Sequence, residues 1–418
     1  MRFNTLNDWL TWQETLHPKA IDLGLERVRE VAARMGLLHP THTVITVAGT
    51  NGKGSSVAML EAILICAGLR VGAYTSPHLW QYNERIRLNG HAVDDDTLVA
   101  SFARIDAARG AISLSYFEFG TLAALDILHR AGVDVAVLEV GLGGRLDAVN
   151  ILDADCALVT GIGIDHVEWL GPDRESIGRE KAGIFRSERP AVCSDPQPPV
   201  SLRAVAQACG AQWYGLGEQF GYAQSGGTWN WWGPGVVLND LPLPALPGSF
   251  QLQNAAGVLM VVQALAARVA ISEQALQSGL RAAQVAGRFA VVPGRFETIF
   301  DVAHNPHAAA ALAQALVARP CSGRTLAVCG MLADKDAAGV AAALAAQVQR
   351  WYLGGLYAVR GQSAQQLAER MRLDPAQRQL FPDMASAYVA ATSEARAGDR
   401  VLVFGSFHTI AELLPPGL

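Results

Sequence analysis

Short runs of β-branched and other apolar residues alternate with alanine- and leucine-rich stretches along most of this 418-residue chain. Helical patterns such as 55–67 and 117–131 separate these runs in the first part of the sequence. Strands this apolar are typical of a parallel sheet that is covered on both faces. The alternation therefore predicts an α/β fold whose first sheet is doubly wound and mostly parallel. The expected strands of that sheet are 43–48, 69–74, 133–140 and 155–162.

Residues 211–247 interrupt this rhythm, because they combine several tryptophans with many glycines and prolines. We expect a small β excursion whose tryptophans pack under a loop. These tryptophans are Trp213, Trp229, Trp231 and Trp232. Helical patterns follow at 250–268 and 272–283.

The strand and helix alternation restarts after a segment that contains glycine and proline. A chain of this length exceeds one ordinary core, so two domains are expected. We predict a first domain at 1–286, a linker at 287–296 and a smaller, Rossmann-like α/β domain at 297–418. The expected strands of the second domain are 298–302, 325–330, 350–353 and 400–404, and its expected helices are 307–318, 336–348, 363–371 and 384–396.

Composition narrows the function classes. Half of the residues are hydrophobic and 17% are charged, as in a well-packed globular protein. The net charge of −5 gives no electrostatic support for nucleic-acid binding. The six cysteines are scattered without a C-x-x-C pair, which argues against a zinc ribbon or disulfide scaffold and favours the reducing cytosol. No apolar run has the character of a signal peptide or the length of a membrane span, so a cytoplasmic protein without membrane partners is expected.

The first predicted strand runs into the glycine-rich loop Gly49-Thr50-Asn51-Gly52-Lys53-Gly54-Ser55, which precedes a helical pattern. A standard P-loop would place a glycine at position 47, where this chain has valine. Glycines still let backbone amides approach an anion, the helix start adds positive potential, and Lys53 neutralises charge. Ser55 and Ser56 are expected to cap the helix or to reach a metal ion. The loop therefore predicts phosphate binding in a P-loop-type domain, and a plain glycine-rich turn is the alternative.

Polar residues also stand at the ends of the other three predicted strands: Ser76, Glu139 and His166. The carboxyl ends of parallel strands meet at one edge of a sheet, so these residues are expected to converge with the loop on a magnesium-nucleotide site. Magnesium prefers oxygen ligands, which makes a histidine ligand unusual. For Glu139 the alternative is a structural ion pair with Arg145.

Three strands of the predicted second domain end in similarly polar sequences. These are DVAHNP at 301–306, GMLADKD at 330–336 and GSFHT at 405–409. Any one of them could be a turn or a helix cap. Together they predict a second substrate-binding edge, facing the first domain.

Seven motifs now stand in order along the chain: the loop 49–55, SPH at 76–78, EVGLGGRLDA at 139–148, DH at 165–166, REKAGIF at 179–185, GRF at 287–289 and DVAHNP at 301–306. Together they resemble the Mur ligase superfamily, and within it the bacterial folylpolyglutamate synthase/dihydrofolate synthase family. The resemblance covers nearly the whole chain and is weakest at 211–247. It implies an ATP-dependent amide ligase that acts as a monomer, with two domains that close on a cleft.

The resemblance also implies roles for individual residues. Thr50–Lys53 would hold the ATP phosphates, and Ser76, Glu139 and His166 would bind Mg²⁺; the family also leaves room for a monovalent cation. Lys181 matches a carbamylated lysine, a modification that turns a cation into an anionic oxygen ligand, although its surroundings in sequence suggest a surface lysine beside Glu180. His304 matches a position close to the nucleotide and the incoming amino acid. Further ATP-binding matches are Asn254, Arg288 and Asp301.

Members of the family that also make dihydrofolate have a dihydropteroate pocket. Its matching segments here are His17-Pro18-Lys19-Ala20, Ser115-Tyr116-Phe117-Glu118 and Leu146-Asp147-Ala148. Tyr116 and Phe117 are suited to stacking on a flat heterocycle, and Asp147 to accepting a hydrogen bond from a pterin N–H; core aromatics at a helix start are the alternative. The chain departs mildly from close relatives at Pro18 and Ala20. Because all three segments are present, we expect both activities.

The expected reaction adds L-glutamate to 7,8-dihydropteroate and to the γ-carboxylate of reduced folates, with ATP forming an acyl phosphate intermediate. A ligase that only extends folates is the alternative within the family. A cell-wall Mur ligase is disfavoured by the compact HPKAIDLGL start. A dinucleotide-dependent oxidoreductase is suggested by Gly141-x-Gly143-Gly144, but no G-x-G-x-x-G precedes a helix there and Lys53 would be unexplained. A non-catalytic nucleotide-binding module is disfavoured by the full set of metal candidates.

Overall fold

The computed structural model describes residues 2–19, 21–358 and 360–415. The chain forms two compact units. The first unit contains the residues up to Ile162 together with Val167–Ala245 and Leu252–Gln284. The second contains Gly163–His166, Leu246–Gln251 and the chain from Val285 onward. Two short segments that precede the predicted boundary in sequence thus belong to the second unit.

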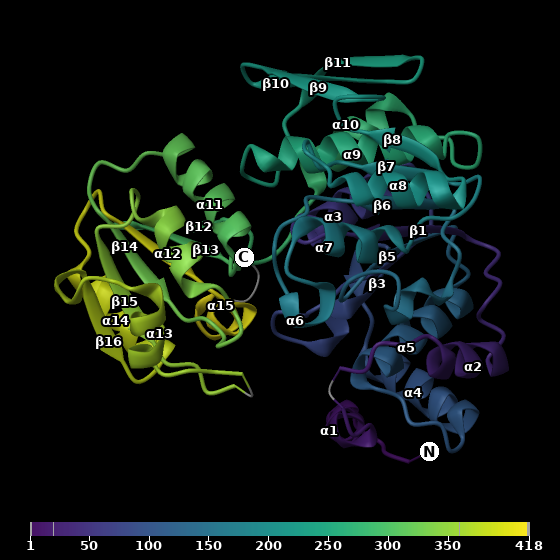
Figure 1. Cartoon of the computed structure of the whole chain (residues 1–418), viewed down its shortest axis with the longest axis horizontal. Coiled ribbons are helices and arrows are strands. Elements are labelled where there is room, and N and C mark those ends of the chain that lie inside the picture. Colours follow the sequence, from purple (N-terminus) through teal and green to yellow (C-terminus); the bar gives the residue numbers. More distant parts are fainter. Residues whose placement is uncertain (1, 20, 359, 416–418) are drawn as a thin grey trace. The chain divides into compact units, whose positions relative to one another are not determined.

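The first unit is built on an eight-stranded sheet with the order β4-β3-β2-β5-β1-β6-β7-β8 (Figure 1). Six strands run parallel: β2, β5, β1, β6, β7 and β8. At the β2 edge, β3 and β4 continue the sheet in antiparallel fashion. The predicted doubly wound, mostly parallel sheet is confirmed, because all four expected strands are present and adjacent as β2, β5, β1 and β6. The strands are β1 (Thr43–Ala48), β2 (Val71–Tyr74), β3 (Ile86–Leu88), β4 (His91–Ala92), β5 (Val135–Glu139), β6 (Cys156–Val159), β7 (Pro190–Cys193) and β8 (Gln212–Gly215).

The helices between these strands begin at side chains that suit helix starts. Asp94 caps α4 by accepting from the Thr97 N–H, and Ser115 and Glu118 form a capping box at α5. The helices are α1 (Leu6–Leu16), α2 (Glu26–Arg34), α3 (Lys53–Cys66), α4 (Asp95–Arg109), α5 (Tyr116–Ala131), α6 (Val167–Leu170), α7 (Arg174–Ala182), α8 (Val200–Cys209), α9 (Phe250–Ala264) and α10 (Glu273–Ala282), with 3-10 turns η1 (Tyr82–Arg85) and η2 (Ala148–Ile151).

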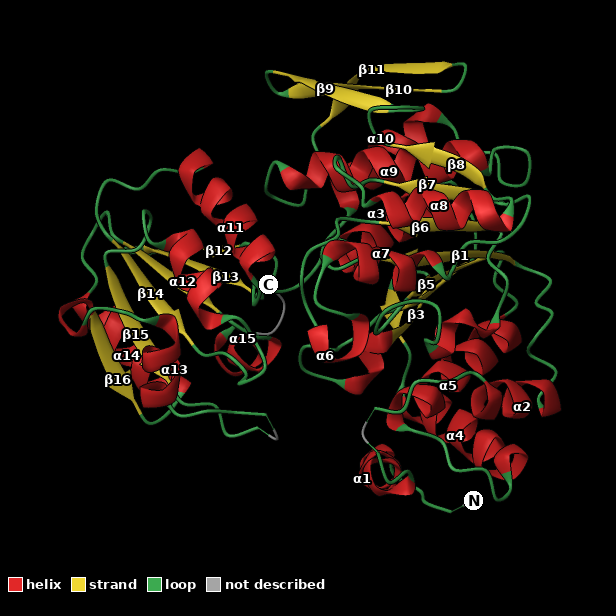
Figure 2. Cartoon of the chain, in the orientation of Figure 1, coloured by secondary structure: helices red, strands yellow, loops and turns green. Residues whose placement is uncertain are grey.

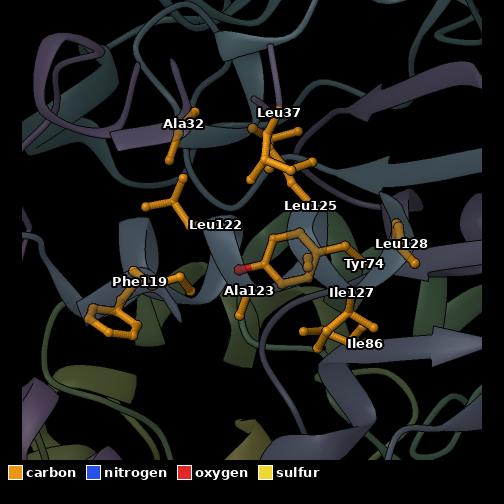
Figure 3. Packing of buried hydrophobic residues seen from close by; sticks show 14 of the residues in the cluster. Ala32, Leu37, Tyr74, Ile86, Phe119, Leu122, Ala123, Leu125, Ile127 and Leu128 are labelled. Atoms are coloured by element: carbon orange, nitrogen blue, oxygen red, sulfur yellow. The ribbon is translucent and has the colours of Figure 1, made fainter. Parts of the chain in front are cut away.

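A hydrophobic core lies where α1, α2, α4 and α5 cover one side of the sheet. The ring centroids of Phe102 and Phe119 are 5.4 Å apart, and Trp9 lies 6.4 Å from Phe119. Figure 3 shows the Tyr74 ring of β2 among the apolar side chains of α5. This packing holds α5 in place, and its first turn carries the predicted substrate segment at 115–118.

The tryptophan-rich segment forms a separate antiparallel sheet next to α9 and α10 (Figure 2). Its strands are β9 (Gly221–Ser225), β10 (Thr228–Gly233) and β11 (Val236–Pro242), while β8 joins the large sheet. Trp229 and Trp231 are fully buried, and the indole N–H of Trp231 donates to the Ala256 carbonyl at 3.1 Å. The packing prediction is confirmed for these two residues and wrong for Trp232, which is 44% exposed because it points to the outer face of the β ribbon.

The second unit holds a six-stranded sheet with the order β12-β13-β17-β14-β15-β16, parallel except for β12. The predicted Rossmann-like α/β architecture is confirmed. Residues 287–296 are not a simple linker, because β12 lies within them and pairs with β13. The strands are β12 (Ala290–Val292), β13 (Glu297–Asp301), β14 (Thr325–Cys329), β15 (Arg350–Gly354), β16 (Arg378–Phe381) and β17 (Arg400–Phe404). The helices are α11 (Pro306–Ala318), α12 (Ala337–Leu344), α13 (Ala364–Met371), α14 (Met384–Glu394) and α15 (Phe407–Leu413), with the 3-10 turn η3 (Pro375–Gln377).

Across the described residues of both units, no helix combines the length and the apolarity that crossing a bilayer requires.

Helix α10 crosses α3 so closely at Gly279 that a Cβ atom there would overlap the backbone of Ile63. We expect Gly279→Ala to lower the free energy of unfolding of the first unit by about 1–3 kcal/mol, because overpacking forces the two helices apart. Gly227→Ala is a matched control, since no atom lies within 4 Å of its Cβ position. Urea unfolding followed by tryptophan fluorescence would measure both variants. Equal midpoints for the two variants would contradict this account of the helix crossing.

Candidate active site

The loop between β1 and α3 has a backbone that only glycine can adopt at two points. Gly49 and Gly52 have φ values of 148° and 93°. A Cβ atom on Gly49 would overlap the Thr160 hydroxyl, and one on Gly52 would lie 2.5 Å from the Asn254 Oδ1. The Thr50 and Asn51 N–H groups donate to the Gly161 carbonyl at 2.9 and 3.3 Å. The loop is therefore held against the end of β6 on one side and against α9 on the other.

Two lysines from distant parts of the chain meet at this loop. The Lys53 Nζ donates to the carbonyl oxygens of Gly49 and Thr50 at 3.0 and 3.4 Å. The Lys181 Nζ, on α7, donates to the same Gly49 oxygen at 3.0 Å. The expectation of a surface lysine is wrong, because Lys181 is only 4% exposed. The convergence gives the loop two ammonium groups, which suits an anion such as phosphate.

The serines after Lys53 do not cap the helix. Gly52 is the N-cap of α3, and no side chain caps it. Ser55 and Ser56 lie buried inside the first turns of the helix. The capping expectation is therefore wrong, since α3 begins two residues earlier than its hydrophobic pattern indicates.

Glu139 ends β5 beside the loop. Its Oε2 accepts from the Ser76 N–H at 3.3 Å and lies 3.9 Å from the Cβ position of Gly54. The alternative pairing with Arg145 is wrong, because Arg145 pairs with Glu180 at 2.9 Å. Ser76 and Glu139 therefore share the loop's edge of the sheet and offer oxygen ligands. In the part of the chain that the structure describes, no three His, Cys, Asp or Glu side chains cluster as a metal cage, and Mg²⁺ commonly completes its shell with water and substrate phosphates.

An ion-pair chain connects two of the predicted dihydropteroate segments. The His17 ring contacts the Ser113 hydroxyl at 2.7 Å and Asp22 at 3.1 Å. Arg27 on α2 pairs with Asp22 at 2.8 Å and with Glu118 at 3.2 Å. Pro18 and Lys19 are exposed, and Ala20 lies outside the described residues. The third predicted segment, 146–148, lies next to the other two, because η2 begins at its last residue and packs against α2 and α5.

Ser115 and Glu118 have a structural role at the start of α5. Each side chain accepts from the backbone N–H of the other, so the S-x-x-E spacing is a capping box. Tyr116 and Phe117 are half-buried between these caps. The Phe117 ring lies 6.0 Å from the Tyr74 ring and fills the space that a side chain on Gly141 would need.

Asp147 is a buried carboxylate that closes the loop after β5. Its oxygens accept from the N–H groups of Leu142 at 2.8 Å and Val149 at 3.0 Å. Burial raises the pKa of Asp147 to about 6, and the backbone donors only partly oppose this shift. Its neighbours in the predicted segment differ in exposure, since Leu146 is half-buried and Ala148 is buried. Asp147 therefore holds the backbone of the loop after β5 in place.

Three candidates lie together in the second unit at the end of β13. Asp301 accepts from the N–H groups of Phe289 and Ala303 at 2.9 and 2.8 Å, and burial raises its pKa against the charge of Arg288. The Arg288 guanidinium lies 5.8 Å from the Phe407 ring centroid. The His304 Nδ1 is 2.8 Å from the Val302 carbonyl, so this nitrogen carries the proton.

Asp165 and Lys335 form a buried pair in the same unit; the sequence marked both of their segments as polar strand ends but did not predict that they pair. The Lys335 Nζ donates to Asp165 at 2.8 Å, and Asn305 donates to the other Asp165 oxygen at 3.1 Å. Burial alone would raise the pKa of Asp165, but the contact with His304 and the charge of Lys335 hold it well below its ordinary value. His166 follows it in the segment 163–166 that belongs to this unit.

Residue usage offered a signal for Lys335. Only four of the 33 lysine and arginine residues are lysines: Lys19, Lys53, Lys181 and Lys335. Three of them were assigned to predicted sites, and the fourth is the buried partner of Asp165. In a chain that uses arginine for most of its cations, a lysine suggests a position that requires a compact ammonium group.

Comparison with known proteins decides the family. Residues 47–262 match the Mur ligase middle domain, and residues 287–407 match the Mur ligase glutamate ligase domain. The chain is 49% identical to the dihydrofolate synthase/folylpolyglutamate synthase of Escherichia coli over 98% of its length and 94% of that protein. It is 43% identical to the Haemophilus influenzae protein of the same name, over 97% and 96% of the two chains. The chain belongs to the dihydrofolate synthase/folylpolyglutamate synthase family of Mur ligases.

Solved structures of dihydrofolate synthase/folylpolyglutamate synthases have the same fold as this chain. The E. coli enzyme in complex with DHPP and ADP superposes with a TM-score of 0.94 at 49% identity, covering 98% of this chain and 97% of that one. A bifunctional family member with Mn, AMPPNP and L-glutamate bound gives 0.91 at 48% identity, with the same coverages. This chain is therefore an ATP-dependent glutamate ligase of that family.

The raised pKa of Asp147 predicts a pH dependence of stability. The folded state binds more protons than the unfolded state between about pH 4 and pH 6, because burial raises the folded pKa above the ordinary value of 3.8. The wild type should therefore lose about 3 kcal/mol of unfolding free energy relative to Asp147→Asn as the pH rises through this window. Urea unfolding of both proteins from pH 4 to pH 7.5 measures the difference. A difference that stays constant with pH would contradict the shift.

Proposed function

We propose that this enzyme adds L-glutamate to the carboxylate of 7,8-dihydropteroate, giving dihydrofolate, and to the γ-carboxylate of reduced folates, giving polyglutamates. ATP is the co-substrate, and ADP and phosphate are released. The observation that carries the proposal is the convergence of Lys53 and Lys181 on the Gly49 carbonyl, next to the Glu139 carboxylate. A lysine ammonium group and a carboxylate beside a glycine-rich loop suit phosphoryl transfer.

The proposed reaction needs a phosphate because a carboxylate is a poor electrophile. It is negatively charged, and amide formation would have to expel oxide. Transfer of the γ-phosphoryl group of ATP to a carboxylate oxygen gives an acyl phosphate, whose leaving group is phosphate. The glutamate amine then attacks the acyl carbon, phosphate departs and the nitrogen loses a proton. Bringing the amine and the acyl phosphate together away from water favours this attack over hydrolysis.

We assign the ATP phosphates to the loop Thr50, Asn51, Gly52, Lys53, Gly54 and Ser55, with Lys53 stabilising the charge that develops on the transferring group. We assign the rest of the nucleotide to Asn254, Arg288 and Asp301. Asn254 supports this assignment by lying against Gly52 of the loop. We place His304 near the incoming amino acid, since its Nδ1 donates to the Val302 carbonyl and its Nε2 lies 3.6 Å from the Asp165 carboxylate, which orients the ring.

We propose Mg²⁺ as the divalent metal, held by Ser76, Glu139 and His166. The fit is supported by the oxygen atoms that Ser76 and Glu139 offer beside the phosphate loop. Bound there, Mg²⁺ would neutralise and orient phosphate oxygens. The Mn reported in a relative's structure with AMPPNP is compatible with this choice.

We propose that Lys181 is carbamylated. Its Nζ is buried and donates to the Gly49 carbonyl, and burial disfavours the charged ammonium form. A carbamate there would replace one of two neighbouring positive charges by anionic oxygens near the metal candidates. Intact-mass measurement of the protein in bicarbonate would detect the added group.

We propose that the dihydropteroate pocket is formed by residues 17–20, 115–118 and 146–148. The Asp22–Arg27–Glu118 ion pairs support this assignment by tying the first two segments together. The half-buried Tyr116 and Phe117 rings suit a flat heterocycle. A ligase that only extends folates is the second candidate.

Lys53→Ala should abolish most ligation without unfolding the protein. Removing one preorganised charge from the transferring phosphoryl group is expected to lower kcat at least a hundredfold, on the order of the loss for one oxyanion donor. An ADP-release assay with dihydropteroate and L-glutamate measures the rate, and circular dichroism checks the fold. Arg70→Ala is the control, because Arg70 is exposed and pairs only with Asp134 among its described neighbours. Activity within a few-fold of wild type would contradict the role of Lys53.

Incorporation of labelled L-glutamate with dihydropteroate and with tetrahydrofolate, run side by side, separates the two candidate functions. We expect label in the product of both reactions. Label only with tetrahydrofolate would leave folate extension as the function.

Arg27→Met should impair the dihydropteroate reaction while the KM for ATP stays unchanged, because it breaks the ion pairs that tie residues 17–20 to residues 115–118.

A further inference from the structure

Arg85 is a half-buried arginine of the first unit that has no carboxylate within 4 Å among the described residues. Arg87, two residues later, shows the usual arrangement, because it pairs with Glu61 at 2.7 Å. A guanidinium group stays charged at all relevant pH values, and a partly buried charge is costly without a partner. The position of Arg85 therefore suits an anion that comes from outside the chain.

Aromatic rings hold the Arg85 side chain in place. Its guanidinium carbon lies 5.2 Å from the centroid of Tyr82 and 5.7 Å from that of Tyr116. The Nε–H donates to the His78 Nδ1 at 2.9 Å, so His78 accepts at that nitrogen. A guanidinium group offers a fork of terminal N–H donors whose geometry matches a carboxylate. Rings that flank a cation also offer a surface for an aromatic ligand.

The same group of residues includes polar atoms that point to a ligand. The Tyr82 hydroxyl is buried without a hydrogen-bond partner, although a buried phenol normally has one. It lies 2.6 Å from the Cβ position of Gly120, and the Tyr74 hydroxyl lies 3.3 Å from that point. Burial raises the pKa of Tyr74 to about 12, so its hydroxyl stays a neutral donor. The Arg85 guanidinium thus lies beside tyrosine rings and a histidine nitrogen, and no carboxylate lies within 4 Å of it among the described residues.

Arg85 also lies close to both the proposed metal edge and the proposed acceptor segment. Its carbonyl accepts from the Thr75 N–H at 2.9 Å, one residue before Ser76, whose N–H donates to Glu139. On its other side stands Tyr116, in the predicted substrate segment. Arg85 therefore lies between the proposed metal and phosphate edge and the proposed acceptor pocket. A substrate carboxylate that receives a phosphoryl group has to be bound between the phosphate site and the pocket that holds the rest of the acceptor.

We propose that Arg85 binds the carboxylate of the acceptor substrate, with the Tyr82 and Tyr116 rings against its aromatic part. This rests on the proposed function, because it takes the aryl carboxylate of dihydropteroate as the ligand. The guanidinium group neutralises the carboxylate, so that two anions are not forced together when the γ-phosphoryl group approaches. Arg85 makes no covalent bond in the reaction, and its part is to bind and orient the nucleophilic oxygen.

The test compares dihydropteroate with its carboxamide analogue as ligands of the full-length protein, using calorimetry with AMPPNP present. In Arg85→Met we expect the Kd for dihydropteroate to rise about ten- to hundredfold, the range for loss of one charged hydrogen-bond partner. The Kd for the carboxamide and the Kd for AMPPNP should stay at their wild-type values. Arg70→Met, which removes an exposed arginine, should change none of the three.

Two results would overturn the proposal: unchanged dihydropteroate binding in Arg85→Met, or an equal loss for the carboxylate and the carboxamide, which would make Arg85 a residue that only shapes the pocket. If Arg85→Met does not fold, Arg85→Lys decides. Lysine keeps the positive charge but lacks the forked pair of N–H donors. Arg85→Lys should therefore raise the Kd for dihydropteroate more than the Kd for its carboxamide. A wild type that binds AMPPNP but neither acceptor would refute the proposed function, and this subsite with it.

Discussion

The carbonyl oxygen of Gly49 is the point at which the glycine-rich loop is fixed to the rest of the first unit. Lys53 and Lys181, far apart in sequence, both donate to it at 3.0 Å. The carbonyl can face them only because the loop takes a backbone conformation open to glycine, with the Thr160 hydroxyl filling the space of a side chain. The loop, the end of β6 and helix α7 are thereby fixed to one another. Glu139, at the end of β5, lies beside the same loop at Gly54.

Arginine pairing organises the other side of the unit. Arg27 joins Asp22 to Glu118 and so fixes the approach of α2 to α5. Arg87 neutralises Glu61 on α3. Both arginines pair with carboxylates of the fold, and an ion pair within the fold tells little about a ligand. Arg85 differs because aromatic rings and a histidine nitrogen surround it instead of an acid. The contrast, more than the presence of another arginine, suggests a substrate carboxylate.

Pattern and propensity predicted most of the fold. The apolar runs 43–48, 69–74, 133–140 and 155–162 became adjacent parallel strands, because strands covered on both faces must be continuously hydrophobic. The same reasoning placed Ser76 and Glu139 at one sheet edge. It could not place Lys181, since a lysine next to a glutamate on a short helix gives no local sign that tertiary packing buries it. Nor could it predict that Trp232 faces outward while Trp231 faces inward, because this depends on which face of the β ribbon packs against α9.

The sequence by itself determined the two α/β units, the phosphate-type loop and the polar strand ends, because each follows from local periodicity and from what glycine and lysine can do. The tertiary structure alone decided which distant side chains meet. It brought Lys181 to Gly49, inserted β17 between β13 and β14, paired Lys335 with Asp165 and placed Arg85 against tyrosine rings. Contacts of this kind depend on long-range packing and on the desolvation of charge, and neither is encoded within any short stretch of the chain.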